Sequence, residues 1–352
     1  MNKMQKMKIR VLLIYKLRKP YGCTDDSILF SYGLSNSAKF VAEALNGLDG
    51  SPIEAKAVGV IDNNCIDKVV HEYKPTHVIV EALWVVPEKF EVLMKLHPNV
   101  KWNVRIHSKT PFLANEGIAF DWIDKYISIN GLSISGNNLD FVRDIQRVYH
   151  LTGKKMAYLP NIYPLSETEN LAKKLNDNVL AVGCFGSIRP MKNTLQQALA
   201  SIMLAKKLNK QLFFHVNKRA EQGGEQVLKN LRALFAAQPH ILVEHEWMPH
   251  SEFVKLIRCM DIGLQVSMTE SFNIVTADFV CQNVPIVVSE DVHWMNGIYK
   301  ANPNSAEDIA KKMKRALWLK RFDFQCLNKI NLAIFNENAL DSWLDYFTKS
   351  FA

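Results

Sequence analysis

The segment MKIRVLLIY, residues 7–15, is a short apolar run bounded by charged side chains. A run of this length and composition predicts a buried strand. A loop containing Gly22 and Gly33 follows, and residues 36–45 then carry apolar side chains at helical spacing. Strand, glycine-containing loop and helix in this order predict the first βαβ unit of a mostly parallel sheet.

The same alternation continues and divides the chain in two. In the first half we expect strands at 55–61, 77–82 and 102–107, with helices at 65–73, 87–96 and 121–129. Two prolines within residues 158–174 predict a linker. In the second half the expected strands are 179–185, 211–216, 241–244, 262–266 and 285–289, and the expected helices are 193–207, 224–237, 251–260, 272–282, 305–319 and 336–349. The predicted fold class is α/β, with two Rossmann-like, doubly wound domains that face a cleft.

The composition fits a globular protein of two domains. The chain has 352 residues, of which 48% are hydrophobic and 22% charged, and this length exceeds one ordinary core. No apolar run approaches the ~20 residues that cross a bilayer, and no signal-peptide pattern follows the basic start, so a cytoplasmic protein is expected. The six cysteines form no C-x-x-C pair, which argues against a zinc or redox motif and favours reduced thiols.

The charge balance points to an anionic partner. The formal net charge is +8, and residues 1–19 contain several lysines and arginines but no acidic residue. Such a surplus favours a nucleotide diphosphate, a nucleic acid or an anionic membrane surface.

The stretch TESFNIVTAD, residues 269–278, holds two carboxylates eight positions apart. Glu270 is expected in the loop after a strand, where it can accept hydrogen bonds from sugar hydroxyls. Asp278 is expected inside the next helix, where it can accept a bidentate pair of hydrogen bonds from two ribose hydroxyls. The backbone N–H groups near Phe272 and Asn273 open that helix and can hold a phosphate.

This stretch resembles the E-x7-E motif of retaining GT-B glycosyltransferases of the family-4 type, with Asp278 in place of the second Glu. The likeness continues upstream through residues 247–264. Downstream it includes NVPIVVS, residues 283–289, in which Asn283 replaces the usual glycine. The resemblance implies that Glu270 is a catalytic residue that orients the donor sugar, and that Asp278 binds the nucleotide ribose.

A second stretch, GCFGSIRPMKN at residues 183–193, follows the first strand of the second half. Arg189 and Lys192 at a strand end can reach a diphosphate leaving group, the guanidinium in a bidentate manner and the ammonium as a point charge. The stretch is similar to a glycine-arginine and lysine-glycine loop of the same family, with Asn193 in place of the second glycine. Trp247 and Met248 lie further upstream, after an expected strand. They are candidates for contact with the nucleotide base, or else for packing in the core.

In the first half, His107 ends an expected strand and resembles the cleft histidine that this family places near the donor sugar. A structural histidine is the alternative interpretation. Lys109 lies close by. The loop after the first strand takes the place of the family's glycine-rich loop, so Arg18, Lys19 and Gly22 are further candidates for contact with an acceptor or a phosphate.

Taken together, the resemblance implies a metal-independent enzyme without a cofactor, whose substrate is a UDP-sugar or a GDP-sugar. Residues 1–165 would form the acceptor-side domain and residues 166–335 the nucleotide-sugar domain, with residues 336–352 as a helix that packs back toward the first domain. His215, His245 and His250 lack the carboxylate spacing of a metal site, which agrees with metal-independent chemistry.

The acceptor stays open. A saccharide or a lipid-linked glycan is favoured, and the basic N-terminal stretch would suit an anionic membrane. The alternative is a modified pyrimidine in DNA, because phage-encoded DNA glycosyltransferases also use GT-B folds. A non-catalytic nucleotide- or nucleic-acid-binding protein is the third interpretation, since Asp278 and Asn283 depart from the family pattern.

Overall fold

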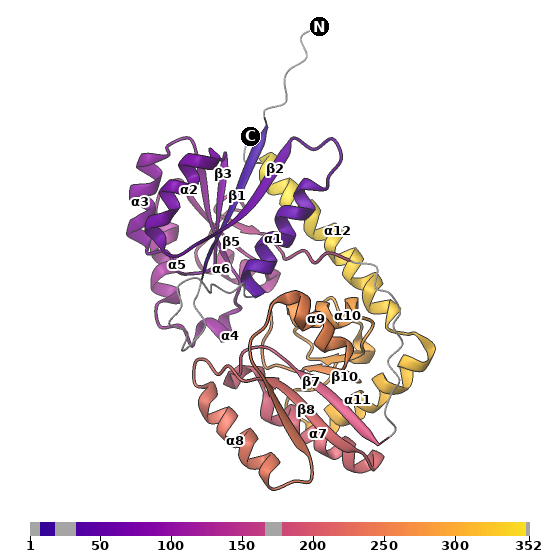
Figure 1. Cartoon of the computed structure of the whole chain (residues 1–352). Coiled ribbons are helices and arrows are strands. Elements are labelled where there is room, and N and C mark those ends of the chain that lie inside the picture. The colour runs from indigo at the N-terminus through magenta and orange to yellow at the C-terminus, as the bar shows by residue number, and fades with distance from the viewer. Residues whose placement is uncertain (1–7, 18–32, 166–177, 350–352) are drawn as a thin grey trace. The chain divides into compact units, whose positions relative to one another are not determined.

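The computed structural model describes residues 8–17, 33–165 and 178–349, and the chain divides into two compact units (Figure 1). Unit 1 comprises Met1–Pro164 and Asn336–Ala352, and unit 2 comprises Leu165–Phe335. The expected limits of these parts were 1–165, 166–335 and 336–352. Three predicted site residues lie outside the described residues: Arg18, Lys19 and Gly22.

Unit 1 is built on a parallel six-stranded sheet with the order β2-β1-β3-β4-β5-β6. The strands are β1 Ile9–Lys16, β2 Ile53–Val60, β3 His77–Glu81, β4 Lys101–Ile106, β5 Leu132–Gly136 and β6 Met156–Tyr158. The helices are α1 Gly33–Asn46, α2 Ile66–Tyr73, α3 Pro87–Leu96, α4 Thr110–Leu113, α5 Ala119–Ser128 and α6 Leu139–Val148, with a 3₁₀ turn η1 at Asn63–Cys65. The apolar run near the start of the sequence therefore forms β1, which lies between β2 and β3 in the sheet.

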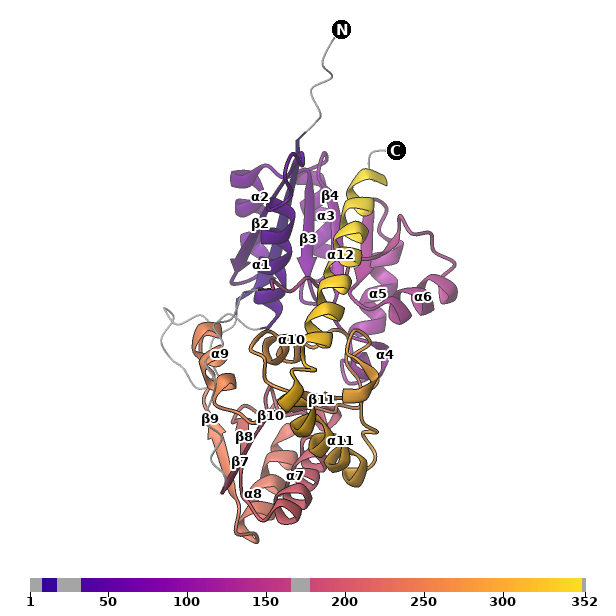
Figure 2. The same cartoon turned by 90° about the vertical axis from the view of Figure 1, so that its right-hand side faces the viewer.

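The helices of unit 1 cover both faces of the sheet. Helices α2, α3, α5 and α6 pack on one face, where Phe90, Trp102 and Tyr126 are fully buried and in ring contact. Helix α12 spans Cys326–Lys349. Helix α1 and the second half of α12 lie on the other face (Figure 2). The sheet is thus buried on both sides, which is what the near-continuous apolar run of β1 requires.

Helix α12 starts ten residues earlier than expected and joins unit 1 through polar as well as apolar contacts. Trp343 Nε1 donates to Pro160 O at 2.9 Å. Asn336 Nδ2 donates to Tyr163 O at 2.7 Å, and its Oδ1 accepts from the Tyr163 N–H at 3.1 Å. Trp343 and Phe347 are fully buried. The aromatic residues near the C-terminus therefore complete the core of unit 1.

Unit 2 contains a parallel five-stranded sheet with the order β11-β10-β7-β8-β9. The strands are β7 Val179–Cys184, β8 Gln211–Asn217, β9 Ile241–His245, β10 Ile262–Gln265 and β11 Ile286–Val288. Helices α7 Thr194–Leu208, α8 Gly224–Ala236 and α11 Ala306–Leu319 cover one face, and α9 His250–Arg258 and α10 Ile274–Cys281 cover the other (Figure 1). Short 3₁₀ turns lie at η2 Pro190–Lys192, η3 Gly297–Tyr299 and η4 Lys320–Phe322.

Helix α10 packs closely on the sheet because two strand positions lack a side chain. A Cβ atom at Gly263 would lie 2.6 Å from the Phe279 ring, and one at Gly183 would lie 2.5 Å from the Phe185 ring and 3.0 Å from that of Phe279. Any larger residue at either position would push the helix away. This close approach fixes the helix that carries Asp278 against β7 and β10.

His77 makes the stability of unit 1 depend on pH. The ring is fully buried at the start of β3, bonded to Thr76 Oγ1 through Nδ1 and packed on Phe347 at a centroid distance of 5.2 Å. Burial, and then the charge of Lys101, lower the pKa of His77 to about 4. The folded chain therefore keeps this ring neutral at pH values where the unfolded chain protonates it.

We expect the free energy of unfolding to fall as the pH is lowered from about 6.5 toward 4, because only the unfolded state binds a proton at His77 in that window. The loss from this residue is on the order of 3 kcal/mol, at ~1.4 kcal/mol per pH unit. His77→Phe keeps a ring against Phe347, so urea titrations at pH about 7 and about 4.5 should show a smaller loss than in the wild type. Equal losses in the two proteins would contradict this role of His77.

Candidate functional site

The loops after β7, β8, β10 and β11 leave unit 2 at the same edge of the sheet, because its strands are parallel. Asn217 at the end of β8 accepts from the Gly186 N–H at 2.7 Å, and Gln265 Nε2 at the end of β10 donates to Phe185 O at 2.7 Å. Gly186 has a φ of 111°, and a Cβ atom there would meet nothing within 4 Å. The loop after β7 is thus pinned from both sides and presents bare backbone to open space, in a conformation that glycine adopts readily.

Arg189 is held in place by an acidic partner that the sequence did not reveal. It precedes η2, and its guanidinium donates to Glu221 in the loop after β8. The second oxygen of Glu221 pairs with Arg219 at 2.6 Å. Burial alone would raise the pKa of the Glu221 carboxyl, but the charges and hydrogen bonds of Arg189 and Arg219 together outweigh it and hold that pKa below its ordinary value. Glu221 therefore stays ionised and orients the cation.

Lys192 and Glu270, two predicted site residues, form an ion pair. Lys192 Nζ donates to Glu270 Oε1 at 2.5 Å, and the Glu270 side chain is 8% exposed. The Glu270 N–H donates to Asp291 Oδ2 in the loop after β11 at 3.0 Å. The backbone supports the contact, because the Met268 N–H donates to Met191 O at 2.8 Å. Three loops therefore hold this cation and carboxylate together at the sheet edge.

Two departures from the family pattern have a common physical explanation. Asn193 and Asn283 stand where the family uses glycine, and their φ values are 56° and 57°. Asparagine is among the few residues besides glycine that tolerate this left-handed conformation. Asn193 also donates from Nδ2 to Val266 O at 3.1 Å and to Pro303 O at 2.8 Å. The substitutions therefore preserve the backbone turn, and the first adds bonds that fix the Lys192 loop.

The helix start expected at residue 272 was wrong. Helix α10 begins at Ile274, and Asn273 precedes it with a φ of 63° and accepts at Oδ1 from the Thr276 N–H at 2.9 Å. Phe272 is 1% exposed, packs on Trp294 and accepts from the indole Nε1 of that residue at its carbonyl at 2.9 Å. One amide at this helix end is therefore already capped, and the Phe272 ring belongs to the core.

Asp278 is almost fully buried in α10 and accepts at Oδ1 from His250 Nε2 at 2.6 Å. This hydrogen bond raises the pKa of His250, against the opposing effect of burial. His250 opens α9, and the loop before it contains the half-buried Trp247 and Met248. The sequence placed His250 outside any metal site but did not reveal its partnership with Asp278, because the two residues lie 28 positions apart.

Three buried hydroxyl groups lie in the loops that surround Glu270. The Oγ atoms of Ser267 and Ser289 and Oγ1 of Thr269 have no hydrogen-bond partner within the described residues. All three side chains are at most 5% exposed. Buried hydroxyls are normally paired, so an unpaired group is a place where a bound ligand or a water supplies the partner.

Unit 1 carries a buried charged network at the carboxyl ends of β3, β4 and β6. Arg105 and Glu81 are neighbours across β4 and β3, and both are fully buried. Arg105 donates to both oxygens of Glu81, at 3.2 and 3.0 Å, to Leu159 O at 2.8 Å and to Asn161 Oδ1 at 2.6 Å. Its guanidinium also lies 5.1 Å from the centre of the Trp343 ring. Because the cation is paired on every side, its burial is tolerated.

His107, the predicted catalytic histidine, completes this network. Its Nε2–H donates to Glu81 Oε2, and Asn137 Nδ2 lies 3.4 Å from its Nδ1, which assigns the tautomer with the proton on Nε2. Burial, and next the charge of Arg105, lower the pKa of His107, so the ring is neutral near pH 7. Lys109, two positions further on, precedes α4 and lies 3.9 Å from Asp140.

No group of three or more His, Cys, Asp or Glu side chains that could hold a metal occurs among the residues that the structure describes. His215 and His245 stack at 5.1 Å and share a hydrogen bond of 2.9 Å, but this pair has no third ligand of that kind within the same residues. No helix in the described ranges is long and apolar enough to span a bilayer.

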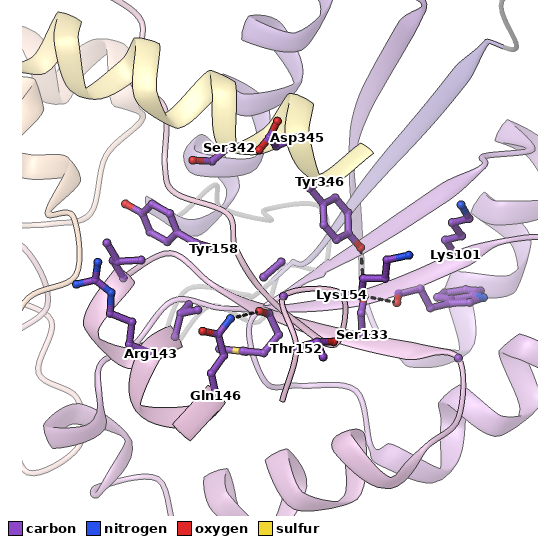
Figure 3. A pocket seen from close by; sticks show the side chains of 17 residues that line it. Lys101, Ser133, Arg143, Gln146, Thr152, Lys154, Tyr158, Ser342, Asp345 and Tyr346 are labelled. Atoms are coloured by element: carbon purple, nitrogen blue, oxygen red, sulfur yellow. Dashed lines mark hydrogen bonds between the residues drawn. The ribbon is translucent and has the colours of Figure 1, made fainter. Parts of the chain in front are cut away.

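A separate cavity of about 890 Å³ lies at the free edge of the unit 1 sheet (Figure 3). Its walls come from α6, β6 and the second half of α12, including Arg143, Tyr158 and Tyr346. Tyr346 OH and Ser133 Oγ are 3.1 Å apart on its lining. This cavity is distinct from the Lys192 and Glu270 cluster of unit 2, and His107 is not part of its lining.

Comparisons with known proteins identify the fold. No protein-family model matches the chain, and no curated protein matches it. Several solved structures are similar to the chain over almost its whole length. An α,α-trehalose-phosphate synthase (UDP-forming) from Burkholderia xenovorans in complex with glucose-6-phosphate has a TM-score of 0.69 at 11% identity, covering 97% of this chain and 100% of that one. The α,α-trehalose 6-phosphate synthase from Burkholderia multivorans has a TM-score of 0.65 at 12% identity, covering 98% and 96%.

A third structure, the trehalose-6-phosphate protein of E. coli bound with UDP-2-fluoro glucose, has a TM-score of 0.63 at 12% identity, covering 97% and 98%. The chain has the GT-B fold. At these identities the likeness establishes the fold alone. The predicted α/β class with two Rossmann-like domains is confirmed, and so is the resemblance to GT-B proteins at the level of the fold. The roles of the individual residues of this GT-B protein remain predictions.

The network in unit 1 yields a stability prediction. Arg105→Met leaves the Glu81 carboxylate buried without its main cation, and we expect this to cost about 3–5 kcal/mol, as breaking a buried ion pair does. Adding Glu81→Gln removes the stranded charge while keeping an acceptor for His107, so the double variant should regain part of the loss. Urea unfolding of the two single variants and the double variant measures the coupling. Additive losses would show that the pair does not act as a unit.

Proposed function

We propose that this chain is a retaining glycosyltransferase that moves a sugar from a nucleoside-diphosphate sugar to a hydroxyl group of a saccharide. The observation that carries the proposal is the Lys192–Glu270 ion pair at the carboxyl edge of the unit 2 sheet. A cation and a carboxylate lie side by side there. The cation can bind a diphosphate, and the carboxylate can accept hydrogen bonds from the hydroxyl groups of a sugar. The GT-B fold, shared with structures bound to UDP-2-fluoro glucose and to glucose-6-phosphate, supports this interpretation.

The proposed reaction breaks the bond between the anomeric carbon and a diphosphate oxygen, whose electron pair stays on the leaving group. The acceptor oxygen bonds to the same carbon with retention, and its proton passes to the departing diphosphate oxygen. Lys192 and Arg189 stabilise the charge that develops on the diphosphate. Asn273 and its neighbour Phe272 keep the start of α10 in place beside this region. In this scheme the side chains supply the stabilising charge, and no metal or cofactor takes part.

Glu270 has two successive partners in this scheme. Before the donor binds, it neutralises Lys192. When the diphosphate takes over the ammonium, the carboxylate is released to accept hydrogen bonds from the donor sugar. The buried hydroxyls of Ser267, Thr269 and Ser289 surround this position and provide polar groups that a sugar can pair with. An ion pair of low exposure thus preserves both charges until the substrate separates them.

The nucleoside would be recognised by residues from α9 and α10. Asp278 accepts from the ribose hydroxyls, with His250 beside it to fix the carboxylate. Trp247 and Met248 are half-buried in the loop before α9 and offer an apolar surface for the base. These features fit a UDP-sugar or a GDP-sugar equally well.

His107 of unit 1 is proposed to act toward the donor sugar and the acceptor, with Glu81 and Asn137 as its positioning residues. Lys109 is a candidate for an anionic group on the acceptor, and so are Arg18, Lys19 and Gly22, which precede α1 in the sequence. A phosphorylated sugar is therefore the first acceptor to test. A lipid-linked glycan and duplex DNA are the further acceptors to compare in a transfer assay.

The donor can be identified by a thermal-shift screen of the full chain with UDP, GDP and their sugars. We expect one base to raise the melting temperature, because a ligand that binds only the folded state stabilises it. The donor that binds should also be hydrolysed slowly without an acceptor. Stabilisation without hydrolysis or transfer to any acceptor would favour a non-catalytic nucleotide-binding protein.

Glu270→Gln provides the sharper test of the chemistry. Because the change keeps the shape but removes the charge that pairs with Lys192, we expect normal folding and a loss of turnover of at least about 100-fold. Glu246→Gln is the matched control, since Glu246 is exposed and pairs with Lys218 at 2.6 Å. Both variants are assayed for transfer and for donor hydrolysis. Unchanged turnover in Glu270→Gln would contradict the proposed function.

A further inference from the structure

Helix α11 has two faces of different character. Ile309, Met313, Ala316 and Leu319 are buried against the rest of unit 2. The opposite face, at spacings of three and four, is exposed: Lys311, Lys314, Arg315 and Trp318. The stripe continues into η4, where Arg321 and Phe322 are exposed. One side of the helix therefore anchors it, and the other carries four cations and two aromatic rings.

The aromatic end of this stripe is unusually open for its size. Trp318 is 54% exposed and Phe322 is 57% exposed, and their rings contact each other with centroids 4.9 Å apart. Phe324, two residues further on, is 43% exposed. Single exposed apolar side chains need no explanation, but three large aromatic ones within seven positions form a patch of the kind that marks a docking surface.

The cations beside this patch are not neutralised by the protein. Within the described part of the chain, Lys311, Lys314, Arg315 and Arg321 form no ion pair. The acids nearest in sequence already have other partners: the Asp308 carboxylate accepts from the Asn302 N–H at 2.9 Å, and Asp323 accepts from Asn283 Nδ2 at 3.4 Å. The stripe thus keeps a positive charge next to its aromatic rings.

We propose that the basic-aromatic face, made of Lys311, Lys314, Arg315, Trp318, Arg321 and Phe322, binds an anionic lipid surface. Indole and phenyl rings settle at the boundary between headgroups and acyl chains, while lysine and arginine bind the anionic headgroups. A duplex nucleic acid would use the cations, but its bases are stacked inside the helix, so it would give the Trp318–Phe322 pair no apolar phase to enter. The face shares no residue with the Lys192–Glu270 cluster, so this binding is separate from the proposed transfer reaction.

The test is flotation of the full-length protein with vesicles of phosphatidylcholine, alone or with about a third phosphatidylglycerol. The wild type should float with the anionic vesicles and lose this binding at high salt. Trp318→Ser/Phe322→Ser and Lys314→Glu/Arg315→Glu should each lower the partition coefficient by at least about tenfold, since apolar burial and headgroup attraction both contribute. The Trp318 emission should shift to the blue on binding.

Arg147→Glu/Val148→Ser is the matched control, because it changes an exposed cation and an exposed apolar residue on α6 of unit 1. It should float like the wild type, and all variants should keep the wild-type melting temperature and donor hydrolysis. Failure of the wild type to bind anionic vesicles would overturn the proposal, as would binding of both face variants at the wild-type level. If sedimentation showed instead that the face joins two copies of the chain, or if it bound duplex DNA and no vesicles, the proposal would also be wrong.

Discussion

The contact between Lys192 and Glu270 joins two loops that are 78 positions apart in the chain. It ties the end of β7 to the end of β10, and the Asp291 carboxylate adds the loop after β11. Neither charge is fully open to water, so each depends on the other to stay in place. The other polar groups at this edge, from the Arg189–Glu221 pair to the unpaired hydroxyls, are arranged around this junction. A substrate that carries both an anion and hydroxyl groups can replace each partner with its own.

A similar principle organises unit 1, where the partners are more deeply buried. Register places Glu81 opposite Arg105 on adjacent strands, and the carboxylate is shared with His107. The network fixes one tautomer of His107 and keeps the ring neutral. It also places Trp343 of α12 beside Arg105, so the last helix of the chain supports the same edge. In both units, charges at strand ends are fixed by pairing with residues far away in the sequence. Groups held in this way need little rearrangement when a ligand binds.

The sequence could predict the two sheets because buried parallel strands leave a strong local signal, a short apolar run between helices. It could also predict that Lys192 and Glu270 lie at the carboxyl edge of the second sheet, because each follows an apolar strand run in the sequence. It did not give β5, α6 and β6, since LSISG is broken by serine and MAY is only three residues long. The start of α10 was placed two residues early because Phe272 looks like a helical apolar position, whereas the left-handed Asn273 ends the preceding loop. The partners Glu221, His250, Glu81 and Arg105 were missed because each pairs with a residue far away in the sequence and not through any nearby motif. For Glu81 and Arg105 the pairing follows from the register of β3 and β4.

The most direct measurement of the central claim is the affinity of UDP and GDP, without a sugar, for the wild type and for Glu270→Gln by calorimetry. If the ion pair must open before the diphosphate binds, removing the Glu270 charge should release Lys192. The preferred nucleotide should then bind the variant more tightly than the wild type, even though the variant loses transferase activity. Lys192→Gln, which removes the cation itself, should weaken binding. Weaker binding of the nucleotide to Glu270→Gln, or no effect of Lys192→Gln, would contradict the account.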